Sequence, residues 1–320
     1  MIAVIGGAGL KVQVMMIPKE DAYEQQPQMG DMYDYNQVNV AAQIAQGDDI
    51  KIESNGSAFN MACYLAKLGK DVTFLSVTAD DAMGLAVIEQ LKRAGVGYSH
   101  VDIVEGNTPV QVELLNVLND PQMVFGNSKL YEAITTERVQ GWSEVLDGAE
   151  AIVLDGAIPK ETLEYIAETY GGKEGVKLFF DPAGYVGAVN SRDVIGNFYC
   201  VMPGRVEAEA MVRNTVLSAD QLMEAGQFFE DKGVKRIIIT IKGGGLYYKE
   251  GASAGVLAPE RVLSFAMTSG AGDVVSAAVV AADLDGKPIE EVGAFAMQRA
   301  AEFLAGKSDE RMIDVLNEKN

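Results

Sequence analysis

The segment Ser269-Gly270-Ala271-Gly272-Asp273 places small residues and one carboxylate directly before an apolar stretch rich in Val and Ala. That stretch, residues 274–282, predicts a buried helix, and Gly270 and Gly272 let the preceding backbone approach a ligand closely. The N–H groups left unpaired at a helix start bind anions, and a carboxylate in the first turn stays ionised there. Asp273 could therefore accept the proton of a substrate hydroxyl. The alternative is that Ser269 or Asp273 only caps a buried helix.

A second segment of small and polar residues, Asn55 to Asn60, lies far upstream and also precedes a predicted helix. The helix has apolar residues at positions 61, 65 and 68, and it ends at Gly69. A strand-like run at residues 72–77 and a turn at residues 80–84 follow it. The chain thus contains two loops that open into helices, one near each end.

These two segments, in this order, resemble the two signature regions of the PfkB, or ribokinase-like, family of carbohydrate and nucleoside kinases. The resemblance extends over nearly the whole chain. Within the family, residues 153–162, 180–182 and 202–209, with a stretch ending at residues 131–135, look most like the pseudouridine kinase branch. The resemblance implies a kinase that uses ATP and Mg²⁺ to phosphorylate a small sugar or nucleoside-like molecule.

The resemblance also implies the residues of the site. Asp273 would be the catalytic base, with Gly270, Ala271 and Gly272 forming the anion hole beside it. The implied cofactor-binding residues are Lys242, Gly243, Gly245, Ser269 and Glu207, and the implied substrate-binding residues are Lys11, Asn55, Gly56 and Asn60. Glu207 would also organise magnesium, through water and not directly. The glycines after Lys242 could equally form a hairpin turn between two strands.

Composition agrees with a large enzyme and excludes several other classes of protein. The 320 residues are 48% hydrophobic, which is enough for a sizeable core. A net charge of −20 argues against binding nucleic acid or an anionic membrane surface, and no apolar run is long enough to span a membrane. Two cysteines in apolar segments and no signal peptide predict a cytoplasmic protein. The single histidine, His100, argues against most zinc sites, and we expect it in a polar connection.

Strand-like and helical segments alternate from residue 81 onward. Residues 137–147 predict one helix, and residues 218–232 predict another that Ser218 caps. The run Arg236 to Ile241 has the unbroken β-branched pattern of a strand buried on both faces. This pattern predicts an α/β fold, a doubly wound and mostly parallel sheet with helices on both faces. We expect one ribokinase-like domain over residues 1–320. The resemblance implies a small β lid inserted in it, with strands at about 11–17, 50–54 and 109–126, and a possible homodimer through the lid. The alternative for residues 109–126 is an ordinary edge hairpin.

The ends of parallel strands are where such sheets bind ligands. Gly7, Asp181, Pro203 and Lys242 each follow a predicted strand and are expected on the same side as the Gly270 turn. These positions would surround the site that the two signature segments predict.

The sequence departs from the family pattern at the acceptor end more than at the phosphate end. Lys11 stands where the family usually has an aspartate that grips substrate hydroxyls, and Asn55 replaces the first glycine of the substrate-side pair. In the Asn-x-x-Glu element that organises magnesium, Gly204 replaces the asparagine while Glu207 remains. Lys242 stands where a glycine is common.

Three functions remain open from the sequence. The first is an ATP-dependent kinase that phosphorylates a hydroxymethyl group. The second, favoured by Lys11 and Gly204, is a nucleotide- or metabolite-binding protein that kept the fold but lost turnover. The third is a different α/β enzyme.

Overall fold

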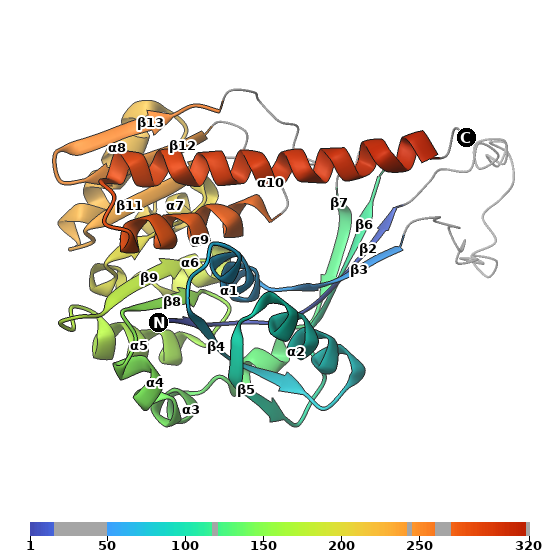
Figure 1. The fold of residues 1–320 in the computed structure, drawn as a ribbon. Coiled ribbons are helices and arrows are strands. Elements are labelled where there is room, and N and C mark those ends of the chain that lie inside the picture. The colour runs from blue at the N-terminus through green and yellow to red at the C-terminus, as the bar shows by residue number, and fades with distance from the viewer. Residues whose placement is uncertain (16–49, 117–120, 242–244, 260–269, 318–320) are drawn as a thin grey trace, which may run out of the picture.

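The computed structural model describes residues 1–15, 50–116, 121–241, 245–259 and 270–317, with side chains described up to residue 305. Its main element is a nine-stranded sheet with the strand order β13-β12-β11-β10-β9-β8-β1-β4-β5 (Figure 1). The strands are β1 Ile2–Ile5, β4 Val72–Ala79, β5 Gly97–Val104, β8 Ala151–Asp155, β9 Lys177–Asp181, β10 Cys200–Val201, β11 Arg236–Ile241, β12 Gly245–Glu250 and β13 Ser253–Leu257. Only β12 and β13 join it antiparallel.

Helices cover both faces of this sheet. One face packs against α1 Ser57–Lys67, α2 Ala82–Ala94, α9 Ala271–Leu284 and α10 Ile289–Asn317. The other packs against η2 Lys129–Ala133, α3 Thr136–Gly141, α4 Ser143–Asp147, α5 Lys160–Tyr170, α6 Tyr185–Asn190, η3 Ile195–Asn197, α7 Arg205–Val212 and α8 Ala219–Asp231. The predicted doubly wound, mostly parallel α/β fold is confirmed. In the described part of the chain, no helix is both long and apolar enough to cross a membrane.

Strand order reverses at β1, which pairs with β4 on one side and with β8 on the other. Successive strands run outward from this point in both directions, and such a switch point is where open α/β sheets bind ligands. The carboxyl ends of β1 and β8 therefore mark the centre of the candidate site.

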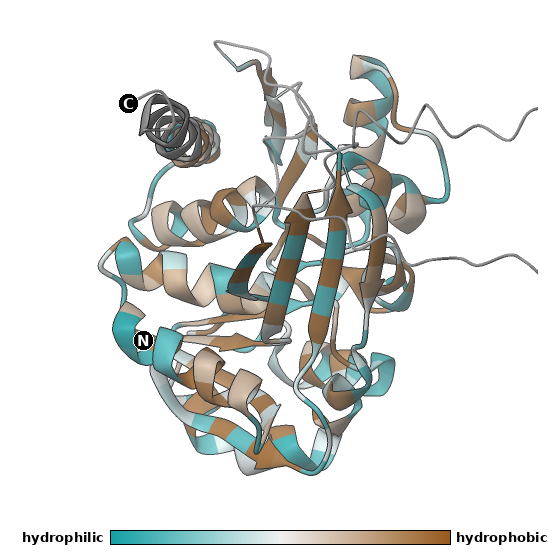
Figure 2. Cartoon of the chain, turned by 90° about the vertical axis from the view of Figure 1, so that its right-hand side faces the viewer, coloured by the Kyte–Doolittle hydropathy of each residue, from teal (hydrophilic) through white to brown (hydrophobic). Residues whose placement is uncertain are grey.

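A separate four-stranded sheet projects from the main body, with the order β3-β2-β6-β7 (Figure 1). Its strands are β2 Gly9–Met15, β3 Ile50–Asn55, β6 Val110–Leu115 and β7 Pro121–Gly126. Residues along these strands alternate between hydrophilic and hydrophobic (Figure 2), so the sheet has one polar and one apolar face.

Two local predictions were wrong. We expected His100 in a polar connection, but it lies in β5, the edge strand of the main sheet. Only Val101 is buried in β5, so the strand lacks the apolar run that marks its neighbours. The single helix predicted over residues 137–147 is two helices, α3 and α4, interrupted at Trp142.

The end of α9 farthest from Asp273 is held by a buried ion network around Asp283. One carboxylate oxygen of Asp283 accepts hydrogen bonds from Arg236 Nη1 (2.7 Å) and the Tyr199 hydroxyl (3.0 Å), and the other accepts one from Lys177 Nζ (2.6 Å). Because the Asp283 side chain is fully buried, removing its charge would leave Lys177 without its ion-pair partner and Arg236 with Glu250 alone.

We therefore expect Asp283→Asn to lower the free energy of unfolding by about 3 kcal/mol. The matched control is Asp285→Asn. Asp285 is 55% exposed and pairs with Lys70 at the same helix end, so its loss should cost under about 1 kcal/mol. Urea denaturation of both variants measures the difference, and equal stability of the two would contradict this role of the network.

Candidate active site

Asp273 lies in the first turn of α9, as predicted, and is held by two side chains of α1. The Ser57 hydroxyl donates to one carboxylate oxygen and Asn60 Nδ2 donates to the other, each at 2.7 Å. The structure thus brings together the two signature segments, which are more than 200 residues apart in the chain. Asn60 Nδ2 also lies 3.3 Å from Asn55 Oδ1 at the base of the four-stranded sheet.

Burial raises the pKa of Asp273, and the nearby Glu207 carboxylate raises it further. The hydrogen bonds from Asn60 and Ser57 and the positive charge of Lys11 act in the opposite direction. A carboxylate with a raised pKa is a stronger base, which suits the removal of a proton from a hydroxyl.

The start of α9 carries the predicted anion hole. Gly270 is the N-cap residue and has a left-handed conformation (φ 80°), which favours glycine. Gly272 is exposed, and a Cβ added to it would meet no atom of the described residues within 4 Å, so these residues leave space beside the turn. The first N–H groups of α9, those of Ala271, Gly272 and Asp273, have no partner within the helix and can bind an anion.

Glu207 lies in the first turn of α7 and uses both carboxylate oxygens. One accepts the N–H of Gly184 at 2.5 Å and the other accepts the N–H of Gly204 at 2.6 Å. The Gly204 contact is one of the two hydrogen bonds of a capping box. The second is missing, because Gly204 has no side chain to accept the N–H of Glu207. The charge of Glu207 also raises the pKa values of Asp181 and Asp273, so it lies at the same site.

Asp181 at the end of β9 is a further buried carboxyl near Glu207. It accepts hydrogen bonds from the Ser276 hydroxyl (2.6 Å) and from the Ala183 N–H (2.9 Å). Burial, together with the charges of Glu207 and Asp273, raises the pKa of Asp181 well above its usual value. Asp181 and Glu207 thus bring two carboxyl groups to this part of the site, but the described residues contain no cluster of three or more His, Cys, Asp or Glu side chains that could bind a metal ion directly.

Lys11 lies in β2 on the polar face of the four-stranded sheet, where it is 6% exposed. Its Nζ forms an ion pair with Glu53 in β3 at 2.7 Å. The charge of Lys11 lowers the pKa of Asp273, as expected of a cation close to the base. Two residues farther along, Glu113 accepts hydrogen bonds from Gln13 and Gln111, each at 2.8 Å.

Two of the predicted glycines lie where close packing leaves no space for a side chain, and other predicted residues lie outside the described part of the chain. Gly56 has φ 136°, and a Cβ there would lie 2.3 Å from the Gly7 carbonyl oxygen, so only glycine fits. Gly245 starts β12, where a Cβ would lie 1.9 Å from the Leu257 carbonyl oxygen. Lys242, Gly243 and Ser269 lie outside the described residues, as do residues 16 and 17 of the first predicted lid strand.

Sequence reasoning missed Ser57, Glu53 and Asp155 as parts of the site. Ser57 lies within the second small-residue segment. Asp155 directly follows the buried strand of residues 151–154, and Asp181 was predicted at the site because it too directly follows a strand. Nothing in the sequence alone pairs Glu53 with Lys11, because the pairing depends on the register of β2 and β3.

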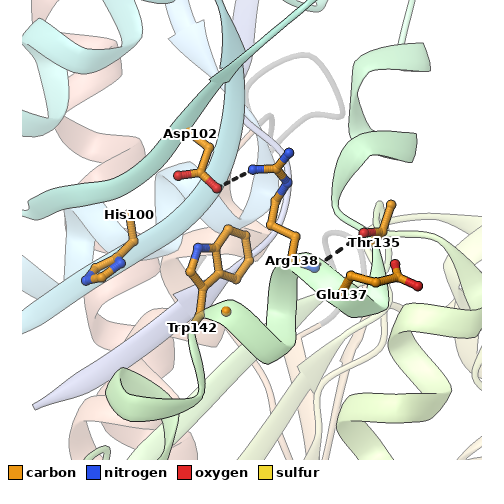
Figure 3. Close-up of a pocket in the computed structure, with 7 residues that line it drawn as sticks. His100, Asp102, Thr135, Glu137, Arg138 and Trp142 are labelled. Carbon is orange, nitrogen blue, oxygen red and sulfur yellow. Dashed lines mark hydrogen bonds and ion pairs between the residues drawn. The ribbon is translucent and has the colours of Figure 1, made fainter.

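A cavity of about 520 Å³ lies elsewhere, between β5 and α3 (Figure 3). It is lined by His100, Asp102, Thr135, Glu137, Arg138, Gly141 and Trp142. Asp102 and Arg138 form an ion pair across it, and Thr135 caps α3. The cavity contains none of the predicted site residues.

The chain belongs to the pfkB family of carbohydrate kinases, whose model matches residues 28–311. It is therefore a phosphotransferase, a sugar or nucleoside kinase, as the sequence predicted. A relative, the pseudouridine kinase of Escherichia coli K12, is 27% identical over 82% of this chain and 83% of its own length.

Solved structures share the fold. The Arabidopsis thaliana ribokinase complexed with ribose and ATP is 20% identical, with a TM-score of 0.76 over 93% of this chain and 90% of that chain. A structure from E. coli in complex with ATP and Mg²⁺ is 16% identical, with a TM-score of 0.68 over 92% of this chain and 89% of that chain. The first of these proteins thus binds ATP, and the second binds ATP and Mg²⁺.

Proposed function

We propose that this kinase transfers the γ-phosphoryl group of ATP to a hydroxymethyl group of a nucleoside-like acceptor. The observation that carries the proposal is the arrangement of Asp273. It lies at the open start of α9, and Ser57 and Asn60 orient both of its oxygens. The acceptor class rests on the similarity to pseudouridine kinase and on the polar face of the four-stranded sheet.

In the proposed mechanism, Asp273 takes the proton of the acceptor hydroxyl while the oxygen of that hydroxyl attacks the γ-phosphorus of ATP. The bond from the γ-phosphorus to ADP breaks, and ADP leaves. The N–H groups of Ala271, Gly272 and Asp273 stabilise charge on the transferring group. Gly245, with Lys242, Gly243 and Ser269, would line the nucleotide. Bound Mg²⁺ supplies neutralisation of phosphate charge, and Glu207 would hold it through water. Catalysis is then mainly positioning and electrostatic stabilisation.

We propose that the four-stranded sheet is a lid within a single domain of residues 1–320, and that its polar face contacts the acceptor. Lys11 cannot accept hydrogen bonds from a sugar diol, because an ammonium group only donates. Since Glu53 already balances its charge, the pair offers a donor and an acceptor side by side. Such a pair suits a neutral base with adjacent N–H and carbonyl groups better than it suits an anionic group. Asn55, Gly56 and Asn60 would position the sugar near Asp273.

An ATP-consumption screen with magnesium tests this proposal. The acceptor panel should include pseudouridine, uridine, adenosine, ribose and a sugar carrying a carboxylate. We expect a nucleoside with an imide-bearing base to be the best acceptor and free ribose to be poor. The best turnover with the carboxylate sugar would instead mean that Lys11 binds an anion.

We expect Lys11→Met to weaken acceptor affinity by about tenfold, or roughly 1.4 kcal/mol, with ATP affinity unchanged. Lys51→Met is the matched control, because Lys51 lies on the same face of the sheet but is exposed, opposite Gln13. KM for the acceptor and for ATP in both variants measures the effect. Wild-type acceptor affinity in Lys11→Met would show that Lys11 does not contact the acceptor.

We also propose that two copies pair through the apolar face of the lid. Large side chains on this face are exposed, among them Ile50 (61%), Ile52 (63%), Met123 (51%) and Phe125 (53%). An apolar patch of this kind on a protein surface commonly marks an interface. Sedimentation velocity tests the pairing, and a monomer at micromolar concentration would contradict it.

A further inference from the structure

Three elements meet at the carboxylate of Asp155, at the switch point of the main sheet. Asp155 is the last residue of β8 and is fully buried. One of its oxygens accepts the N–H groups of Gly7 after β1 (3.2 Å) and of Ala58 in α1 (3.0 Å). The other accepts the N–H of Ala157 at 3.0 Å. Asp155 therefore joins the end of β1 and the start of α1 to β8.

The chain makes room for this carboxylate by having glycine beside it. A Cβ on Gly6 would lie 2.4 Å from the Asp155 carboxyl carbon and 2.6 Å from the Ala58 side chain. Gly7 likewise has no space for a side chain, since a Cβ there would lie 2.6 Å from the Tyr131 ring. The junction is thus packed closely around the carboxylate.

The segment that Asp155 holds is the one that orients Asp273. Ala58 lies directly after Ser57 and two residues before Asn60, and the side chains of Ser57 and Asn60 are the hydrogen-bond donors to Asp273. A shift of the α1 start would move both donors together. Asp155 and Asp273 are thus linked through α1.

Holding this segment with a buried carboxylate is energetically costly. Burial raises the pKa of Asp155 to about 6, although three N–H donors lower it. The groups that face it are Asp181 in the register position on β9, Asp273 on α9 and Tyr131 on η2, and none is a cation. In the described part of the chain, no Lys or Arg forms an ion pair with Asp155.

We propose that Asp155 is a positioning residue for phosphoryl transfer. In its ionised form it holds the start of α1 so that Ser57 and Asn60 orient Asp273. An ionised carboxylate can accept hydrogen bonds on both oxygens, whereas protonation or amidation converts one oxygen to a donor that faces an N–H group. The inference rests on the proposed role of Asp273 as the base.

The acid side of the pH profile carries the most specific test. If Asp155 and Asp273 must both be ionised, the wild-type kcat falls with decreasing pH with the steepness expected for two protons. In Asp155→Asn only Asp273 of this pair still titrates, while Asp181 and Glu207 are the same in both proteins, so the profile should lose the steepness of one proton. A one-proton slope in the wild type overturns the proposal, even if the variant does not fold.

Comparing kcat with the thermal midpoint distinguishes a positioning role of Asp155 from a role in stabilising the fold. We expect Asp155→Asn to lower kcat by about tenfold or more near neutral pH, because small displacements at a reacting group are costly. The variant removes a buried charge that has no cation as its partner. We therefore expect its thermal midpoint to stay close to that of the wild type while kcat falls. Asp283→Asn, a buried carboxylate at the other end of the sheet, is the control and should lower the midpoint while keeping the wild-type slope.

Two outcomes besides a one-proton slope in the wild type would overturn the inference. The first is wild-type kcat in Asp155→Asn, and the second is loss of kcat only in proportion to loss of folded protein, as in the control. Failure of the proposed function is distinguishable from both. In that case the wild type itself shows no acceptor-dependent ATP consumption at any pH, whereas failure of this inference leaves wild-type turnover intact.

Discussion

Asp273→Asn is expected to slow phosphoryl transfer by about 10²–10⁴-fold, or roughly 3–5 kcal/mol of barrier. Asparagine keeps the shape of the side chain but cannot accept the proton of the acceptor hydroxyl. Single-turnover kinetics with ATP, Mg²⁺ and the acceptor found in the screen would measure the loss. Asp285→Asn, at the other end of α9, is the matched control and should keep wild-type turnover.

The folding stability of Asp273→Asn should not fall together with its activity. Burial raises the pKa of Asp273 above its usual value, so ionisation costs folding free energy at pH values above the raised pKa. This destabilisation is absent below the usual pKa of an aspartate, and it is absent at every pH in the asparagine variant, which does not ionise. Turnover, in contrast, requires the ionised form and falls as pH falls through the raised pKa. Full activity of Asp273→Asn would reduce Asp273 to a helix cap and remove the proposed mechanism.

Glu207→Gln is expected to raise the magnesium concentration needed for half-maximal turnover by about tenfold or more. With Gly204 supplying no side chain, the Glu207 carboxylate should carry most of the organisation of Mg²⁺ at the start of α7. Affinity for ATP without metal should be unchanged. A magnesium titration of kcat, with ATP binding measured in chelator, separates the two effects.

Glu209→Gln provides the control on the same helix. Glu209 binds Arg205 at 2.8 Å and the Val216 N–H at 3.1 Å, so it serves the packing of α7 and not the site. An unaltered magnesium titration in Glu207→Gln would leave Glu207 with only its hydrogen bonds to Gly184 and Gly204, as a structural cap.

The buried parallel strands and their covering helices were predictable because burial on both faces leaves a strong pattern. Arg236–Ile241 was predicted with its observed bounds, and Ser218 caps α8 as expected. The edge strand β5 was not predictable, since it is exposed along most of its length. The break at Trp142 had one local signal, Gly141 at the end of α3, but a single glycine inside a helical pattern does not by itself indicate a break.

The site could be predicted only as far as local signals reach. Small residues before a helix indicated Asp273 and the Asn55–Asn60 segment, and their meeting depends on packing between α1 and α9. The ion pair of Lys11 with Glu53 and the junction at Asp155 depend on strand register and on backbone N–H groups of distant segments. Such contacts have no counterpart in the spacing of residues along one chain.

The measurement that tests the central claim most directly is mass spectrometry of acceptors after incubation with ATP, Mg²⁺ and the wild-type protein, with Asp273→Asn in parallel. We predict that a nucleoside such as pseudouridine gains one phosphoryl group on its hydroxymethyl oxygen in the wild-type reaction, and that the variant forms far less product. ATP binding without phosphorylation of any acceptor, or equal product from both proteins, would contradict the account.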